Sequence, residues 1–430
     1  FVKYHDTLGI EKPVYTFYHN YNIPVYFFMS IVVALFVGLI LSAEEIFKDR
    51  KILKRERYLN LSRSSYLLSK VVILFGLSAI QTFCFILVGN WLLEIPLTEM
   101  RYWMILFSCA CFANLLGLNI SSAFDSAVTI YILIPILIIP QLLLSGVVIN
   151  FDKFNPKVGK PNGIPVMGEM MASRWAFEAY MVTQFKDNPF EKQFYDLDKK
   201  RAIADYKRQY YLPQLESKLA FVLNHRGDWR RNDEDNATYQ ALHLLKNEIE
   251  NELSYVGKER LPEVDLITTG KFDSTVYQKT HKFLSTLKEY YTIRSKNAMA
   301  EKENLVKKLT ATPEQAKQLD AMRLKYQNES VNRMVENAND VVRIAEWEGE
   351  LVQKIYPIYF EDHRPTHLLD FSENFYVPQK HFWGRKIDTL YFNIMVIWLM
   401  TVVLFVTLYF DALKKLVHAL EMRRRYGRKK

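Results

Sequence analysis

The sequence predicts an all-α membrane protein, in which a bundle of apolar helices carries a large, mostly helical domain on one side of the bilayer. The mean hydropathy is near zero, but this average combines two unlike parts. Five runs are nearly free of charge, whereas the interval 150–387 is strongly polar. A helix needs about 20 apolar residues to cross the hydrocarbon core. The five runs cover residues 23–42, 66–93, 102–118, 127–149 and 389–410.

Each of these runs is interpreted as a membrane span. The run 102–118 is the shortest and on its own resembles a buried core helix, but a lone soluble helix is not expected between two spans. The first run has no basic flank before it and no small-residue cleavage site after it, which excludes a signal peptide. Because the sequence starts at Phe1 rather than Met, we expect a fragment of a longer chain.

The charges predict the orientation of the spans. Residues 43–64 contain seven Lys and Arg, and the segment after Asp411 contains eight, whereas the link 94–101 contains one Arg. Short cytoplasmic loops collect Lys and Arg, so both basic segments are expected in the cytoplasm. If the chain crosses the membrane once with each span, the segments 94–101 and 150–387 then lie outside the cytoplasm. The N-terminal segment also lies outside, which requires one more span upstream of Phe1.

This threading divides the chain into an outer segment, a membrane part, an outer domain and a basic tail. Residues 388–430 hold eight basic and three acidic residues, so they contribute +5 of the net charge of +9. The excess of basic residues therefore indicates which side of the membrane these segments occupy and does not indicate a nucleic-acid surface. Anionic lipid would also attract these residues. The expected boundaries are 1–22 for the outer segment, 23–149 for four transmembrane helices with a cytoplasmic coupling linker at 43–65, 150–387 for the extracytoplasmic helical domain, 388–411 for the last transmembrane helix and 412–430 for the cytoplasmic tail.

The interval 150–387 is far too long for a loop and shows helical periodicity. A single helix of nearly 40 residues is expected from Asp273 onward, another helix is expected to end at Gly257, and Thr312 is expected to cap a helix with Gln315. Strand signals are weak. The alternating charges indicate solvated helix faces, with a docking surface for a partner outside the membrane as the alternative. The interval contains no cysteine, so it must hold together by packing.

No catalytic or metal-binding motif is found. The sequence has no P-loop, no dinucleotide-binding glycine pattern and no HExxH. Asp362, His363 and His367 lie close together, but Pro365 prevents helical pairing, which favours a polar loop over a metal site.

Polar residues and prolines inside the spans are the candidates for function, because lipid cannot satisfy polar groups. Most are expected to bridge neighbouring helices, and a minority to line a transport path. The candidates for the path are Asn114, Asn119, Pro135, Pro140 and Gln141, and Asn90 is a further polar residue within a span.

Three motifs resemble the G subfamily of ABC transporters. In EEIFKDRKILKRERYLNLSRSSYLLSK, at 44–70, an RER core is followed by Tyr66 and Lys70, as in the linker after that family's second span. MASRWAFEAYMVTQF, at 171–185, looks like the segment after the fifth span, and LLLSGVVI, at 142–149, is similar to the end of that span. The resemblance covers residues 23–185 and, by position, the last span.

The resemblance implies a six-span unit, with the five spans here as the second to sixth. It implies an ATPase domain, fused upstream or separate, that binds ATP and Mg²⁺, while this segment binds no cofactor itself. It also implies a homodimer, and the arrangement looks closest to bacterial half-transporters of the inner membrane. One departure is the outer loop, because residues 186–380 have no counterpart in the family and could accommodate a periplasmic protein partner.

The resemblance also assigns roles to residues. The runs 23–42 and 127–149 would line the central cavity of the dimer, although Tyr26, Phe27 and Phe28 fit an interfacial aromatic belt better. Arg174 and Glu178 are expected to form a structural polar pair beneath the outer domain. The linker residues expected to couple the membrane part to the ATPase are Lys51, Lys54, Arg55, Glu56, Arg57 and Tyr66.

Three functions remain in competition. The first is the membrane-spanning part of an ATP-driven exporter that moves a lipid-like, lipid-linked or protein cargo by alternating access. The second is an ATPase-coupled device that transmits motion through the outer helices to a periplasmic partner. The third is a membrane-anchored sensor, which is disfavoured because five spans exceed what an anchor needs.

Overall fold

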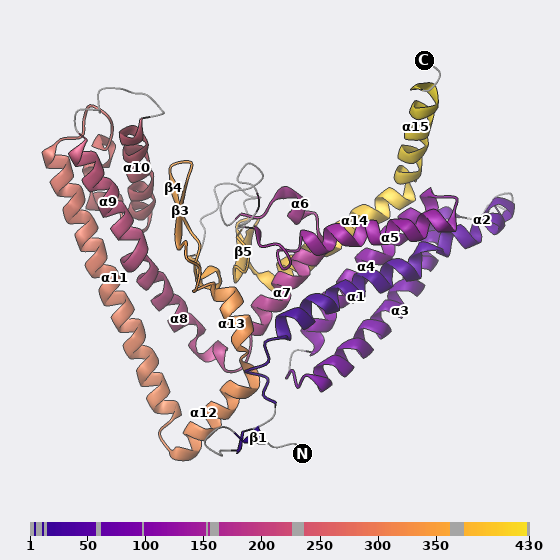
Figure 1. Ribbon diagram of the computed structural model, residues 1–430, viewed down its shortest axis with the longest axis horizontal. Helices are drawn as coiled ribbons and strands as arrows, with labels where there is room; N and C mark the ends of the chain where they lie inside the picture. The colour runs from indigo at the N-terminus through magenta and orange to yellow at the C-terminus, as the bar shows by residue number, and fades with distance from the viewer. Residues whose placement is uncertain are drawn as a thin grey trace.

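The computed structural model describes residues 4–5, 11–12, 15–56, 62–96, 99–151, 154, 163–225, 236–361 and 374–427. It shows a V-shaped molecule in which one limb is a bundle of apolar helices and the other is a long helical arm (Figure 1). The predicted class, an all-α membrane protein with an additional helical region, is confirmed. The strands of the described residues form three short antiparallel hairpins.

The bundle consists of α1 (Ile23–Ala43), α3 (Arg63–Leu92), α4 (Glu99–Ala123), α5 (Ala127–Leu143) and α14 (Thr389–Tyr409). α4 lies at its centre, in contact with α1, α3 and α14. In α4, 83% of the most apolar window is buried, against 28% in α3. The run 102–118, which appeared short in the sequence, is thus the middle of a 25-residue central helix.

Small residues allow α1 and α4 to approach closely. A Cβ atom added to Gly38 would lie 2.8 Å from the carbonyl oxygen of Ala110 and 2.8 Å from the Cβ of Ala113. A Cβ added to Gly117 would overlap the Ser42 hydroxyl. Because lipid provides no hydrophobic drive between helices, such close packing is a main source of their association.

Four helices of the described residues are long and apolar enough to cross a membrane, and α5 is shorter. α5 has 17 residues and contains Pro135 and Pro140. The chain leaves the helix after Leu143 and turns at Gly146, whose φ is 79°. A Cβ there would lie 2.5 Å from the Phe151 ring, so this turn ends the helix before the apolar run 127–149 is complete.

The arm, residues 191–361, is built on two long antiparallel stretches. The first comprises α8 (Glu191–Tyr206), the π-helical turn η3 (Lys207–Tyr211) and α9 (Leu212–Asn224). The second is α11 (Ser274–Leu309), whose 36 residues span about 54 Å at 1.5 Å per residue. The single helix expected here is confirmed.

Two of the remaining arm helices have the capping residues that the sequence indicates. α10 (Ala237–Val256) ends at Gly257, whose φ is 100°. α12 (Pro313–Tyr326) has the expected capping box between Thr312 and Gln315. The short helices η5 and η6 cover Lys258–Arg260 and Pro262–Leu266, and α13 covers Glu329–Glu336.

Weak sequence signals correspond to short hairpins. β3 (Ile344–Trp347) pairs with β4 (Glu350–Gln353), and β5 (Gln379–Phe382) pairs with β6 (Arg385–Asp388). The short helix η7 (Pro357–Tyr359) follows β4. Near the N-terminus, β1 (Tyr4–His5) pairs with β2 (Glu11–Lys12).

The two basic segments lie at the same end of the bundle, away from the arm (Figure 1). They form α2 (Glu45–Glu56) and α15 (Ala412–Gly427). At this end, Arg63 forms a 2.6 Å ion pair with Asp411 and donates to the Leu408 carbonyl. The structure therefore brings together the two segments that the charge pattern assigned to one compartment.

Two helices connect the bundle to the arm. They are α6 (Val166–Glu169) and α7 (Ala172–Lys186). α7 falls within the interval 150–387, which the sequence assigns to the outer domain, but it packs against α1, α4 and α14 of the bundle. The sequence assigns the whole polar interval 150–387 to the outer domain, but the charges of Arg174 and Glu178 in α7 face each other inside the protein.

Candidate functional site

α7 is the element around which the bundle and the arm are joined. All residues from Ala172 to Phe185 are buried, and the helix contacts α1, α4, α5, α13 and α14. It contains no glycine or proline, which favours a straight helix. A helix buried on every face is normally apolar all round, so the two opposite charges within α7 need partners.

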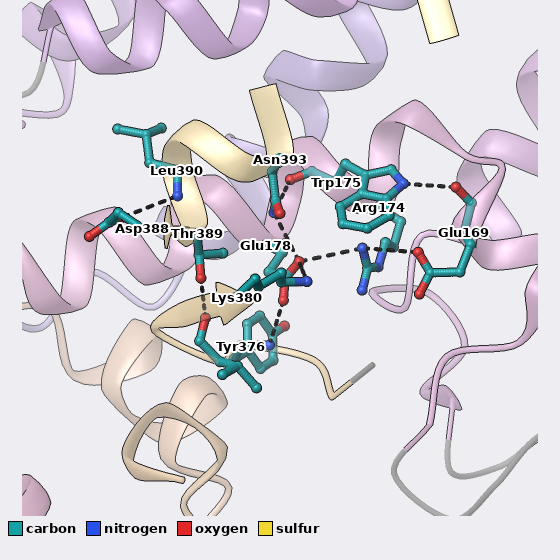
Figure 2. Close-up of polar contacts among 11 residues, drawn as sticks. Glu169, Arg174, Trp175, Glu178, Tyr376, Lys380, Asp388, Thr389, Leu390 and Asn393 are labelled. Carbon is teal, nitrogen blue, oxygen red and sulfur yellow. Dashed lines mark hydrogen bonds and ion pairs between the residues drawn. The ribbon is translucent and has the colours of Figure 1, made fainter. Parts of the chain in front are cut away.

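Glu178 has three donors from other elements (Figure 2). Its Oε2 lies 2.9 Å from the Lys380 Nζ and accepts a 2.9 Å hydrogen bond from the Asn393 Nδ2. Its Oε1 accepts from the Tyr376 backbone N–H at 3.2 Å. Glu178 therefore ties α7 to β5 and to the start of α14, which lie about 200 residues further along the chain.

Arg174 lies between two carboxylates without a hydrogen bond to either. Its Nη1 is 3.5 Å from the Glu178 Oε2 and 3.4 Å from the Glu169 Oε2. In the described part of the chain, none of its guanidinium nitrogens has a hydrogen-bond partner. The guanidinium instead stacks on the Trp175 ring, 3.8 Å from its centroid.

We call Glu169, Arg174, Glu178, Lys380 and Asn393 the α7 junction. Two cations and two carboxylates balance its charge, and Arg174, Glu178 and Lys380 are fully buried. Removing one partner of a buried ion pair leaves an uncompensated charge, which typically costs about 3–5 kcal/mol. The pair of Arg174 and Glu178 that the sequence indicates is thus part of a larger, interdependent cluster.

Lys380 is the member of the junction that sequence reasoning missed. It lies on β5, is fully buried, and has its Nζ 4.7 Å from the centroid of the Trp175 ring. Burial lowers the pKa of the Lys380 ammonium to about 8, although the Glu178 carboxylate opposes this shift. The stretch YVPQKHFW around Lys380 carries no pattern that marks this lysine as buried, so no signal in the sequence was available.

Aromatic rings fill the space between α7 and the bundle. The Tyr180 ring lies 4.9 Å from that of Phe27 and 4.6 Å from that of Tyr102, between ring centroids. Phe28 packs edge-on against Phe177. Phe27 and Phe28 are therefore packed inside the protein and do not form the expected interfacial belt, because α7 covers the face of α1 on which they lie.

The C-terminal end of α7 reaches the arm. The Gln184 Nε2 donates to the Tyr326 carbonyl of α12 at 3.0 Å. Asp187, which follows α7, forms a 2.6 Å ion pair with Arg101 at the start of α4, and Lys186 pairs with Asp388. One helix thus contacts both limbs of the molecule.

The polar residues that the sequence singles out within spans bridge helices. The Asn114 Nδ2 donates to the Ser78 Oγ of α3 at 2.8 Å, and the Asn119 Nδ2 donates to the Leu404 carbonyl of α14 at 2.9 Å. The Gln141 Oε1 accepts from the Ser173 backbone N–H of α7 at 3.1 Å. These bonds join α4 to α3 and α14, and α5 to α7.

The other in-span candidates have different surroundings. Pro135 lies on the exposed face of α5, and Pro140 is half-buried beside Gln141. Asn90 of α3 is only 3% exposed, and in the described part of the chain its amide oxygen and nitrogen have no hydrogen-bond partner.

A groove of about 740 Å³ separates α1 from α3 within the bundle. Small residues such as Gly38 and Gly89 line its walls, and Leu106 and Ala110 of α4 form its floor. Tyr26 lines the groove at the end nearer the arm and stacks on Phe85, with ring centroids 6.5 Å apart. Its lining is mostly apolar, as expected for a surface that faces lipid chains.

The linker predicted at 43–65 is anchored by a residue that was not among its candidates. Arg50 of α2 donates to the Ser122 and Phe124 carbonyls at 2.9 and 2.7 Å, at the C-terminal end of α4. The Ser121 Oγ accepts from the Ile46 and Phe47 backbone N–H groups, which satisfies the N-terminus of α2. α2 is therefore held firmly beneath α4.

The candidate linker residues that the structure describes belong to α2 and to the start of α3. Lys51 and Arg55 are exposed. Tyr66 donates to the Asp49 Oδ2 at 3.0 Å. Lys54 and Glu56 belong to α2, and Arg57 lies outside the described residues.

Asp362, His363 and His367 also lie outside the described residues. Within the ranges that the structure describes, no group of three or more His, Cys, Asp and Glu side chains is arranged to hold a metal ion.

Comparison with known proteins bears on the bundle and α7. The family model described as ABC-2 type transporter matches residues 12–185. This range runs from before α1 to the end of α7, and it supports an ABC-2 permease, the membrane component of an ABC transporter. No match was found among curated proteins or among solved structures.

Proposed function

We propose that this chain is the membrane-spanning part of an ATP-driven exporter that works as a homodimer. The proposal builds on the ABC-2 family match over residues 12–185. The exporter moves a lipid-like, lipid-linked or protein cargo by alternating access between two copies. ATP and Mg²⁺ bind to an ATPase domain, fused upstream or separate, and no step of hydrolysis involves this segment.

The anchoring of α2 supports a coupling role for the linker. Arg50 and Ser121 fix α2 to α4, and α4 is the helix that contacts α1, α3 and α14. A displacement of α2 would therefore be transmitted directly to α4 at the centre of the bundle. Lys51 and Arg55, which are exposed on α2, provide charged contacts for an ATPase surface.

The charge distribution supports an orientation. Because α2 and α15 share one end of the bundle, we assign that end to the cytoplasm and the arm to the periplasm of a bacterial inner membrane. The exposed apolar face of α5, which includes Tyr131, Ile132 and Ile136, provides a surface for lipid or for a second copy.

Transport by the full protein with its ATPase domain in proteoliposomes tests the exporter. Fluorescent phosphatidylethanolamine is the probe, and its ATP-dependent movement between leaflets is measured. Arg50→Ala should reduce transport per ATP hydrolysed several-fold, because it removes the anchor of α2. Lys51→Ala, on the exposed face of α2, should change the affinity of α2 for the ATPase domain and leave α2 in place. Equal transport per ATP in the wild type and Arg50→Ala would contradict this coupling route.

The second candidate is the mechanotransmission device, and α7 favours it. Because α7 is buried along its length and contacts both limbs, a displacement of α1 or α14 would move the arm. In this function the arm acts on a periplasmic partner.

Spin labels at Trp91 of α3 and Met299 of α11, both exposed, distinguish the two candidates after Cys84, Cys109 and Cys111 are replaced by Ser. A nucleotide-dependent change of several ångströms in the distance between the labels, without movement of lipid, indicates mechanotransmission. Lipid movement with a fixed distance indicates export.

A further inference from the structure

The arm contains a cavity at its junction with the bundle. This arm cavity has a volume of about 490 Å³ and lies where α8, α11, α12, α13 and η7 meet. Cavities of about 300–1,000 Å³ are typical of sites for small molecules. Phe185, the last fully buried residue of α7, also lines it, so the cavity adjoins the helix that joins the two limbs.

The charges that line the arm cavity do not balance. Five carboxylates and three cations line it. Asp198 pairs with Lys302 at 2.6 Å, and Asp205 pairs with Arg201 at 3.4 Å. The third cation, Arg323, donates to the Tyr18 hydroxyl at 3.0 Å, and it has no ion pair with a carboxylate of the described residues.

Two of the remaining carboxylates are Glu191 of α8 and Glu336 of α13. Glu191 is only 4% exposed, and its Oε2 accepts from the Gln327 Nε2 at 2.6 Å. The Glu336 Oε1 accepts a long hydrogen bond of 3.4 Å from the Tyr359 hydroxyl. Among the described residues, no Lys, Arg or His lies within ion-pair distance of either carboxylate. The fifth carboxylate, Asp320 of α12, is exposed.

Such carboxylates are costly to keep ionised. Burial raises the pKa of both the Glu191 and the Glu336 carboxyl groups to about 7. The negative charge of Asp198 contributes to both increases, and the positive charge of Lys302 opposes them. An additional cation between them would stabilise their ionised forms and remove much of this cost.

The cavity already holds one ammonium group in the way that a ligand would be held. The Lys302 Nζ lies 2.6 and 2.7 Å from the two oxygens of Asp198 and 5.3 Å from the centroid of the Phe194 ring. Carboxylate contact and an aromatic face are the two elements of ammonium recognition. Around Glu191 and Glu336 the same elements recur, because Tyr356 and Tyr359 also line the cavity.

We propose that the arm cavity binds an organic cation through an alkylammonium group, held between Glu191 and Glu336 and the aromatic walls. The group belongs either to a free amine or to a lysine side chain of a peptide. This site is additional to the permease function, and its occupancy would be sensed by α7. The Asn188 Oδ1 accepts from the Glu191 backbone N–H at 2.8 Å, and the Asn188 Nδ2 donates to the Gln184 carbonyl at 3.0 Å.

Calorimetric titration of the full protein in lipid nanodiscs tests the proposal with two probes, spermidine and the blocked tripeptide acetyl-Gly-Lys-Gly-amide. At pH 8, at least one probe is expected to bind, whereas 1,8-octanediol, which is uncharged, is not. Glu191→Gln and Glu336→Gln should each weaken binding about tenfold or more, as expected for the loss of a charge-assisted contact. Glu314→Gln, an exposed position of α12, is the matched control and should bind normally.

The pH dependence gives a second measurement that needs no variant. Because both carboxyl groups must ionise to hold the cation, affinity should rise from pH 6 to pH 8, with release of protons on binding. Binding of spermidine alone identifies a free amine, and binding of the tripeptide alone identifies a lysine side chain. Absence of binding by both probes at millimolar concentration, or equal binding by the wild type and both Gln variants, overturns the proposal.

Discussion

Glu178 in the middle of α7 and Glu191 at the start of α8 are both buried glutamates, yet their surroundings differ. Glu178 is contacted by Lys380, Arg174 and Asn393, so its charge is matched. Glu191 has the amide of Gln327 as its hydrogen-bond partner, and its pKa is raised to about 7. The comparison indicates that the charges of the α7 junction neutralise one another, whereas the arm cavity has carboxylates that an added cation would neutralise.

The largest effect is expected from breaking the balance at the junction. Lys380→Met leaves three charges, of which Glu178 loses its closest cation, and should lower the free energy of unfolding by about 3–5 kcal/mol. Thermal unfolding of the purified protein in nanodiscs measures this loss. Lys386→Met on the exposed strand β6 is the control.

The double variant Lys380→Met with Glu178→Gln sharpens this test. Because it removes both members of the pair, it should recover part of the stability that the single variant loses. If the stability lost by the double variant equals the sum of the losses of the two single variants, the two residues do not act as a pair.

A smaller effect is expected from titration of the arm cavity. Burial raises the pKa of the Glu191 carboxyl in the folded protein to about 7, from an ordinary value of 4.5. The folded state therefore binds the proton more tightly, and stability should decrease as the pH rises from about 4.5 through 7. The loss for this group is of the order of 3 kcal/mol. Denaturant unfolding at several pH values should show this decrease.

The same measurement on Glu191→Gln provides the control. Because glutamine does not titrate, the variant should lose the contribution of Glu191 to the slope of unfolding free energy against pH. A wild-type profile that is flat between pH 4.5 and 7, or an unchanged slope in the variant, would contradict the assignment. An added alkylammonium ligand should also flatten the slope, which links this prediction to the proposed site.

A still smaller effect is expected where neutral packing joins two helices. Gly117→Ala would place a methyl group on the Ser42 hydroxyl and should cost about 1–3 kcal/mol through overpacking. Gly76 of α3 has no atom within 4 Å of an added Cβ, so Gly76→Ala should be neutral or stabilise the helix by up to about 1 kcal/mol. Melting temperatures in nanodiscs compare the two. Equal shifts would mean that α1 and α4 separate more easily than their spacing indicates.

The sequence predicted what is determined locally. Thr312 and Gln315 form their capping box, α10 ends at Gly257, and α11 is a single long helix. These features depend on residues within a few positions of one another. Hydropathy predicted the spans for the same reason, and four of the five are long and apolar enough in the described residues to cross a membrane. The charge pattern predicted one compartment for the segments that form α2 and α15.

The contacts that define the candidate sites depend instead on distant parts of the chain. Lys380 and Glu178 are separated by 202 positions, and Gln327 and Glu191 by 136. No local pattern distinguishes a buried Lys on a short hairpin from an exposed one. For Arg174 and Glu178, the spacing of four residues on one helix did indicate proximity, but the identity of their other partners could not be read from it.

The π-helical turn at Lys207–Tyr211 has a consequence for the evolution of the arm. Each added residue rotates an α-helix by about 100°, so this turn resets the direction in which the following side chains point. Before it, Ile203 and Tyr206 are buried, and after it Leu215 and Leu219 pack in the core that includes α10 residues. Deletion of one residue here would leave an uninterrupted α-helix whose apolar face after this point turned toward water. Insertions and deletions should therefore be tolerated in the loops of the arm but not at this turn.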